Sequence, residues 1–169
     1  MTPDDRRTDR PESLPGCFRT TTGVAWDELD ALGVLHHSRF LVHAERAFSA
    51  LLDSLGYGYD PDPGIRPERH HVVAGVRVTF SRPLDRPGPL TIEQQVESLG
   101  RTSLTLRFTV TGGAGGQVLA EGVRTVVHID RATRRPRPWS TEFRERLRAG
   151  LAALPAGTDP AGSAGEAAR

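Results

Sequence analysis

One short segment of this sequence gathers side chains that could catalyse acyl transfer. Between residues 26 and 40 it contains, in order, Asp27, Glu28, Asp30, Gly33, His36 and His37. A helical pattern follows directly, so these side chains precede a helix N-terminus. The first N–H groups of a helix lack intrahelical acceptors and carry partial positive charge, so one of them could stabilise the oxyanion formed from a thioester carbonyl. A nearby carboxylate could attack that carbonyl or activate a water to do so.

The same segment resembles the acyl-CoA thioesterases of the 4-hydroxybenzoyl-CoA thioesterase and YbgC-like group of hotdog proteins. Their signature places an aromatic residue, two acidic residues, glycine, hydrophobic residues and histidine before a helix that carries an acidic residue and Arg-Ala. The positions that match without a gap are Trp26, Glu28, Asp30, Gly33, Val34, Leu35, His37, Phe40, Glu45, Arg46 and Ala47. Similarity continues through the Val76–Phe80 strand, the Gly100–Ser103 turn and Val126–Asp130, and so covers roughly residues 18–140.

The resemblance implies a role for each of four residues. Asp30 would be the catalytic carboxylate, acting as nucleophile or general base, and the His37 backbone N–H would be the oxyanion donor. Gly33 would let the loop backbone approach the ligand closely, since glycine has no side chain. Glu45, on the helix, would assist from a neighbouring part of the site.

Five further residues are candidates for substrate binding. Leu32 stands where the family commonly has a small residue and His36 where it usually has an aromatic one, so both would shape the pocket beside Val34. Arg101 and Thr102 lie in the family-like turn, and arginine suits the phosphates of coenzyme A. Two adjacent histidines are poorly placed to bind one metal ion, so we expect no metal site. We expect no cofactor apart from the coenzyme A or phosphopantetheine that the substrate carries.

Hydrophobic periodicity predicts the elements that must position these residues. Residues 18–27 read as a strand. One long helix is then indicated by an apolar stripe of Phe40, Ala44, Ala47, Phe48, Leu51 and Leu55, with Arg39, His43, Arg46 and Asp53 expected on the opposite, polar side. Alternating patterns predict four strands, at residues 72–80, 90–99, 104–110 and 118–129, and a second helix is expected near residues 141–151. We expect His70 and His71, at the start of one strand, to face solvent.

This order predicts an α+β hotdog fold, a five-stranded antiparallel sheet wrapped around one long central helix. Consecutive strands joined by short loops favour antiparallel meanders. One helix leaves the other sheet face or an edge uncovered, so we expect a homodimer or a homotetramer built from dimers. The resemblance implies that the substrate pocket forms between protomers.

The composition of the chain ends predicts one domain with two tails. Residues 1–16 are rich in charge and proline and residues 153–169 in alanine, glycine and proline, so we expect a disordered arm, a domain over residues 17–152 and a disordered tail. No apolar run approaches the roughly 20 residues of a membrane-spanning helix, and the polar N-terminus has no signal-peptide pattern. We therefore expect a cytoplasmic protein without a membrane partner.

Charge and cysteine content exclude other classes. The net charge is +1, and the 22 basic residues are all arginine, interspersed with 21 acidic ones. Without a basic stripe aligned with aromatic residues, nucleic acid is not an expected partner. The single cysteine, Cys17, excludes an intrachain disulfide framework.

Two other functions fit parts of the same pattern. A hotdog acyl-thioester dehydratase would use His36 or His37 with Asp30 or Glu45, although the usual order of residues around its histidine is missing. A non-catalytic hotdog protein could bind acyl-CoA as a sensor. Asp30 could then be an ordinary turn residue, since aspartate favours such loops. The leading hypothesis is a thioesterase that hydrolyses an acyl-CoA or acyl-carrier-protein thioester.

Overall fold

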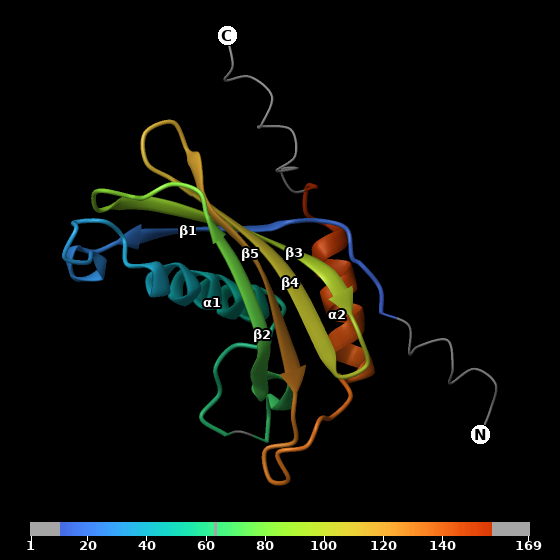
Figure 1. The fold of residues 1–169 in the computed structure, drawn as a ribbon. Coiled ribbons are helices and arrows are strands. Elements are labelled where there is room, and N and C mark those ends of the chain that lie inside the picture. The colour runs from blue at the N-terminus through green and yellow to red at the C-terminus, as the bar shows by residue number, and fades with distance from the viewer. Residues whose placement is uncertain (1–10, 63, 157–169) are drawn as a thin grey trace, which may run out of the picture.

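Figure 1 shows a single curved sheet with one long helix along it and a shorter helix near one end. The structure is a computed structural model that describes residues 11–62 and 64–156. Its strands are β1 (Phe18–Val24), β2 (His71–Phe80), β3 (Gly88–Leu99), β4 (Ser103–Gly112) and β5 (Gln117–His128), and its helices are α1 (His37–Ser54) and α2 (Thr141–Ala152). The predicted hotdog architecture is confirmed, and each predicted strand and helix is present.

The long helix α1 forms where the apolar stripe predicts it. The stripe residues from Phe40 to Leu51 are at most 3 % exposed, and they pack on the concave face of the sheet. The helix begins after His36, whose Nδ1 accepts a hydrogen bond from the Ser38 N–H. One residue differs from expectation: His43, expected on the polar side, is completely buried. Position 43 lies three residues after Phe40 and four before Ala47, so helical geometry places it within the stripe.

The sheet order is β1-β3-β4-β5-β2, with every pair antiparallel. Only β3, β4 and β5 form the expected meander. The prediction that consecutive strands joined by short loops pair is wrong for β2 and β3, because β2 pairs with β5 and β3 pairs with β1 and β4. The two strands that flank α1 in sequence are therefore the two edges of the sheet.

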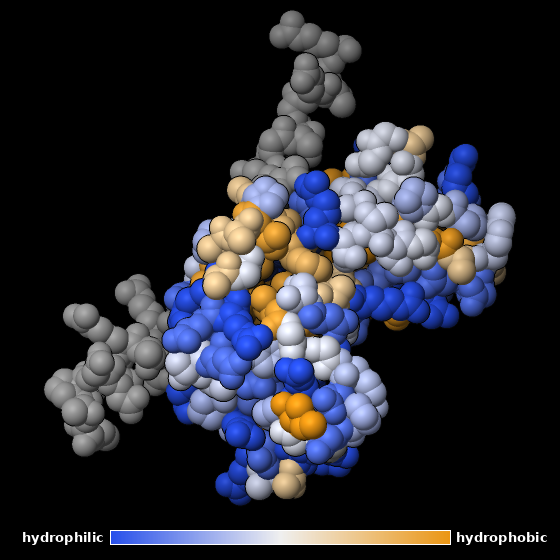
Figure 2. All heavy atoms as spheres, turned by 180° about the vertical axis from the view of Figure 1, so that it is seen from behind, coloured by the Kyte–Doolittle hydropathy of each residue, from blue (hydrophilic) through white to orange (hydrophobic). Residues whose placement is uncertain are grey.

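Both helices pack on the same face of the sheet. One buried cluster joins α1 residues such as Phe48, α2 residues such as Phe143 and sheet residues such as Leu104. A second cluster joins the first half of α1 to the opposite end of the sheet. Seen from behind, most of the surface is hydrophilic, with hydrophobic residues gathered near its middle (Figure 2).

The edge strand β2 is unlike the others because most of it is exposed. Val73 is 52 % exposed, Val76 42 % and Phe80 49 %. A long edge strand with exposed apolar side chains offers unpaired backbone groups to another chain. Among the described strands, β2 therefore presents several exposed apolar side chains at one sheet edge.

The packed domain extends beyond the expected boundaries at both ends. Residues 11–16, expected to be part of a disordered arm, run beside β3: the Leu14 N–H donates to the Val96 carbonyl at 3.1 Å, and Leu14 is buried. At the other end the Cys17 N–H donates to the Pro155 carbonyl at 2.8 Å, beyond the expected limit at residue 152. The rest of the two predicted tails lies outside the described residues. In the described part of the chain, no helix is long and apolar enough to cross a membrane.

Candidate active site

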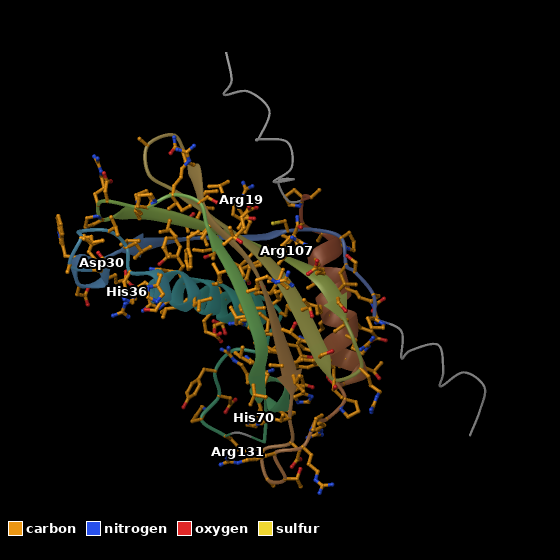
Figure 3. The ribbon with its side chains drawn as sticks, viewed as in Figure 1. Arg19, Asp30, His36, His70, Arg107 and Arg131 are labelled. Atoms are coloured by element: carbon orange, nitrogen blue, oxygen red, sulfur yellow. The ribbon has the colours of Figure 1, made fainter. Side chains whose placement is uncertain are left out.

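The loop between β1 and α1 is held in a defined shape by its own backbone. After β1 the chain makes a short 3-10 helix, Trp26–Glu28. The His36 N–H then donates to the Glu28 carbonyl at 3.0 Å, which closes the loop at the start of α1. The Leu35 N–H donates to the Leu84 carbonyl at 2.8 Å and fastens the loop to the β2–β3 connection. The loop is therefore fixed at the N-terminal end of α1, where Asp30 and His36 lie close together (Figure 3).

Asp30 uses one carboxylate oxygen to build this loop. Its Oδ1 accepts hydrogen bonds from the Leu32 N–H at 2.8 Å and the Val34 N–H at 3.3 Å. The side chain is half-buried, and its Oδ2 has no hydrogen-bond partner among the described residues. Asp30 therefore has the turn role that aspartate often has, and it retains one oxygen that can meet a ligand.

The two histidines at the start of α1 have different surroundings. His36 is committed to capping, because its Nδ1 contacts both the N–H and, at 2.8 Å, the hydroxyl of Ser38. His37 is the first helical residue and is exposed, and its backbone N–H has no acceptor among the described residues. A free first-turn N–H of this kind is what an oxyanion donor requires.

The remaining loop candidates form the outer surface of this end of the molecule. Gly33 has a φ of +74°, a conformation that favours glycine, while the space a Cβ would occupy there is open. Leu32 is 86 % exposed and Val34 is half-buried. Trp26 is also exposed, so the loop carries apolar side chains that a single protomer leaves uncovered.

Glu45 lies on α1 about 12 Å beyond His37, given the rise of a helix. Its carboxylate forms an ion pair with the buried Arg124 of β5 and lies 3.9 Å from His71 Nε2. Burial lowers the pKa of Arg124 to about 10, which leaves it cationic at neutral pH, and its guanidinium lies 4.9 Å from the centre of the Phe48 ring. The expectation that His71 faces solvent is wrong: its side chain is 12 % exposed, and burial lowers its pKa.

Arg101 and Thr102 are not brought to Asp30 within one protomer. They form the β3–β4 turn, where their carbonyls accept the N–H groups of Trp139 and His128. The strand register puts this turn at the opposite end of the sheet from the loop that follows β1. His70 and Arg131 also lie away from Asp30, beyond the start of β2 (Figure 3). A substrate that meets both ends must be long or must span two protomers.

Two hollows of substrate size open near these residues, and neither is lined by Asp30. One of about 470 Å³ lies at the Asp30 end of the sheet, between the β2–β3 connection and the β4–β5 turn. Another of about 580 Å³ lies beside the edge strand β2 and is lined by Glu45, Ser49 and His71, among others.

A buried acid–histidine pair behind the loop was not anticipated from the sequence. Glu28 is 6 % exposed and His43 completely buried, and His43 Nε2 lies 3.3 Å from Glu28 Oε1. Burial alone would raise the pKa of the Glu28 carboxyl, but the Ala25 N–H, His43 and Arg46 together hold it below its ordinary value. Burial lowers the pKa of the His43 imidazole. The signal that could have revealed the pair is the position of His43 within the apolar stripe.

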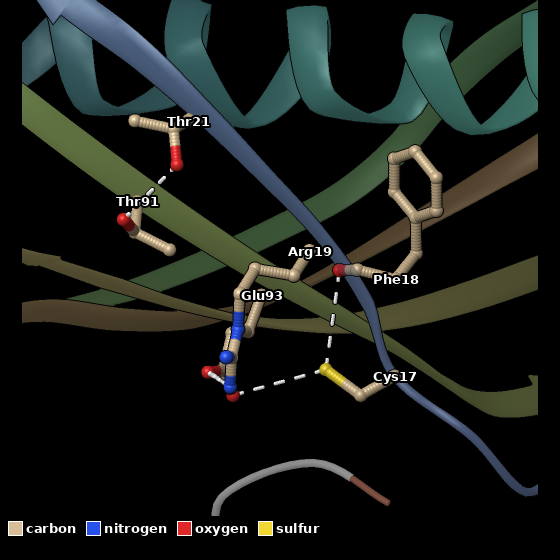
Figure 4. Close-up of polar contacts among 6 residues, drawn as sticks. All are labelled: Cys17, Phe18, Arg19, Thr21, Thr91 and Glu93. Carbon is tan, nitrogen blue, oxygen red and sulfur yellow. Dashed lines mark hydrogen bonds and ion pairs between the residues drawn. The ribbon is translucent and has the colours of Figure 1, made fainter. Parts of the chain in front are cut away.

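Cys17 has no chemical role in this arrangement. Its thiol is buried, and its Sγ lies 3.8 Å from Glu93 Oε2. The same Glu93 carboxylate forms an ion pair with Arg19 (Figure 4). Burial and the neighbouring Glu93 charge raise the pKa of Cys17 to about 11. Since the thiolate is the reactive form, this cysteine is unreactive at neutral pH.

The fold defines a hotdog protein, and comparison with known families agrees. Residues 24–147 match the model of the thioesterase-like superfamily, and the chain belongs to this superfamily. The predicted class, a thioester hydrolase of the hotdog type, is confirmed at this level. No curated protein matches the chain at a significant level.

Several solved structures are similar to this one. YbaW, a probable thioesterase from Escherichia coli, is 27 % identical, with 79 % of this chain and 98 % of that chain covered and a TM-score of 0.61. A 1,4-dihydroxy-2-naphthoyl-CoA thioesterase from Synechocystis is 16 % identical, with 78 % and 96 % covered and a TM-score of 0.67. A Staphylococcus aureus protein solved in complex with CoA is 16 % identical, with 87 % and 91 % covered and a TM-score of 0.72.

Proposed function

We propose that this chain hydrolyses an acyl-CoA thioester to the free acid and coenzyme A, with Asp30 as the catalytic carboxylate. The observation that carries the proposal is the pairing of two unused groups at one helix end. Asp30 Oδ2 and the His37 N–H both lack partners among the described residues; Asp30 lies in the loop that leads into α1, and His37 is the first residue of that helix. Membership of the thioesterase-like superfamily supports the same chemistry.

The chemistry follows from the charges at this end of the helix. The thioester carbonyl oxygen would accept the His37 N–H, which stabilises negative charge as the carbonyl carbon becomes tetrahedral. Asp30 would either attack that carbon and expel the thiolate, leaving an anhydride that water hydrolyses, or remove a proton from an attacking water. Gly33 and the exposed Leu32 would lie against the substrate beside Asp30.

Coenzyme A is the carrier that the relatives favour, because one similar protein was solved with CoA bound and another is a CoA thioesterase. Arg101 and Thr102 would meet the nucleotide end of that carrier, since arginine suits phosphate geometry. An acyl carrier protein offers the same pantetheine arm, and a panel that contains both kinds of thioester separates the two donors.

The functional unit would be a homodimer that pairs the β2 edges, or a tetramer built from such dimers. The exposed Val73, Val76 and Phe80 of β2 would be buried by this pairing, and the two sheets would become continuous. A partner protomer would also cover the open surface around Asp30 and His37, so the pocket would form between protomers.

The decisive experiment measures thiol release from a panel of acyl-CoA and acyl-carrier-protein thioesters by wild type and Asp30→Asn. An asparagine Oδ1 can still accept the Leu32 and Val34 N–H groups, so this variant retains the loop and removes the charge. We expect a loss of at least about a hundredfold in kcat, or roughly 2.7 kcal/mol of transition-state stabilisation. Asp27→Asn, in the same loop but exposed, is the matched control and should retain the wild-type rate.

Other results would favour the other candidates. Thiol release that Asp30→Asn leaves unchanged would exclude Asp30 as the catalyst. Tight binding of acyl-CoA without any thiol release would indicate a binding protein. Loss of water from a 3-hydroxyacyl thioester, without hydrolysis, would indicate a dehydratase.

A further inference from the structure

The buried pair of Glu28 and His43 joins the candidate catalytic loop to the body of α1. Glu28 ends the short 3-10 helix two residues before Asp30. His43 lies two turns into α1 and has no exposed surface. Its Nε2 is 3.3 Å from Glu28 Oε1, an ion-pair contact, and neither ring nitrogen has a partner with hydrogen-bond geometry among the described residues. Burying an imidazole costs free energy unless a polar group contacts it. The Glu28 carboxylate is the polar group that contacts this ring.

Glu28 also connects the two ends of the loop. Its Oε2 accepts the Ala25 N–H at 3.0 Å, at the point where β1 ends. Its backbone carbonyl accepts the His36 N–H at 3.0 Å, at the point where α1 begins. One residue thus contacts the strand end, the helix cap and, through His43, the second turn of the helix. The relative position of Asp30 and the His37 N–H depends on these contacts.

The charges around the pair favour an ionised Glu28 and a neutral His43 at neutral pH. Arg46 Nη1 lies 3.8 Å from Glu28 Oε1, and Arg46 and Arg39 of α1 both oppose a proton on His43, whereas Glu28 favours one. Because Arg46 is 60 % exposed, solvent screens its contribution and His43 is the buried partner of the carboxylate. A neutral His43 would then face the Glu28 carboxylate through Nε2, at 3.3 Å.

We propose that Glu28 and His43 act together as positioning residues that hold Asp30 and the His37 N–H in register with one thioester carbonyl. This inference rests on the proposed function. Neither residue touches the substrate, since Glu28 is 6 % exposed and His43 0 %. They act through the loop, and a displacement of about 1 Å in a catalytic group can cost up to a hundredfold in rate.

The test compares kcat and KM of Glu28→Gln, His43→Phe and the double variant, using the best substrate of the panel. His43→Phe keeps an aromatic ring and its burial but removes both nitrogens. We expect each single variant to lose about tenfold or more in kcat with KM changed less than about threefold, because ground-state binding does not depend on the pair. The double variant should lose no more than the worse single variant, since residues that act as a unit are not additive.

Two controls separate positioning from stability. His43→Gln can place an amide N–H near the position of Nε2, so its kcat should return to within about threefold of wild type. Glu97→Gln makes the same carboxylate-to-amide change in an exposed ion pair with Arg107 and should leave kcat unchanged. If His43→Phe is insoluble, Glu28→Gln and His43→Gln still decide the question.

The positioning role is overturned if Glu28→Gln keeps the wild-type kcat, or if the losses multiply in the double variant. The same follows if His43→Gln is as slow as His43→Phe. These outcomes concern the pair alone when wild type hydrolyses thioesters and Asp30→Asn does not. If wild type releases no thiol, or Asp30→Asn matches it, the proposed function is refuted and the positioning role is refuted with it.

Discussion

The ion pair between Glu45 and Arg124 leads to an asymmetric prediction about stability. Arg124 is 4 % exposed, whereas the Glu45 side chain is 46 % exposed. Glu45→Gln leaves a buried guanidinium without its counter-charge, while Arg124→Met leaves a carboxylate that water can reach. Removing one partner of a fully buried pair costs about 3–5 kcal/mol, and solvent screening of Glu45 reduces this to about 2 kcal/mol for Glu45→Gln. For Arg124→Met, whose side chain can still pack on Phe48, we expect less than about 1 kcal/mol.

The assay is urea unfolding followed by circular dichroism, at one fixed protein concentration because an oligomer's stability depends on it. In a thermal melt of the same variants, a loss of 2 kcal/mol would lower Tm by about 4–8 °C for a domain of this size. The double variant should be no less stable than Arg124→Met, since Glu45 has no counter-charge left to lose. Glu97→Gln, in an exposed pair, should change stability by less than about 0.5 kcal/mol. The reasoning is refuted if Arg124→Met destabilises the protein as much as Glu45→Gln.

Three further predictions follow from other parts of the structure. Val76→Arg places a charge on the exposed β2 edge and should convert the proposed dimer to a monomer in light scattering behind size exclusion; a wild-type monomer would contradict the proposed assembly. Gly122→Ala should lower the free energy of unfolding by about 1–3 kcal/mol, because the new Cβ would lie 2.4 Å from Phe108 Cζ; an unchanged urea midpoint would contradict this. Burial lowers the pKa of His43 and His71 in the folded state below the unfolded value of 6.5. Their contribution to the free energy of unfolding is therefore complete above pH 6.5, and it is lost as pH falls through their folded-state pKa values. Urea unfolding should therefore show less stability at pH 5 than at pH 7.5, and His43→Phe should flatten that dependence.

The local hydrophobic pattern predicted the helices and strands of this fold well, because within each element the apolar residues recur at one fixed spacing. The α1 stripe and the alternating strands needed only neighbouring residues to be recognised. Strand order could not be predicted in the same way, since the pairing of β1 with β3 depends on contacts between distant segments. Residues 11–16 were misjudged because a charged, proline-rich composition resembles disorder, although Leu14 finds a buried position beside Val96.

The candidate site was predictable where a linear motif defines it. Asp30, Gly33 and His37 belong to one short segment that leads into α1, so the motif alone places them in the same stretch of chain. The position of Arg101 was beyond sequence reasoning, because only the register shows that its turn lies at the far end of the sheet. His43 was misassigned since its polarity outweighed its place in the apolar stripe.

The strand order also bears on how the chain reaches its native state. The strands β3, β4 and β5 are neighbours in the sequence and in the sheet, so this meander closes short loops and can form early. The edge strands must instead pair with β3 and β5 across long stretches of chain, and α1, which lies between them in sequence, is enclosed only after both have docked. The loop that carries Asp30 directly follows β1, so we expect it to be assembled among the last parts of the molecule. A chain arrested partway would hold a sheet without catalytic geometry, which makes recovered activity a sensitive measure of complete refolding.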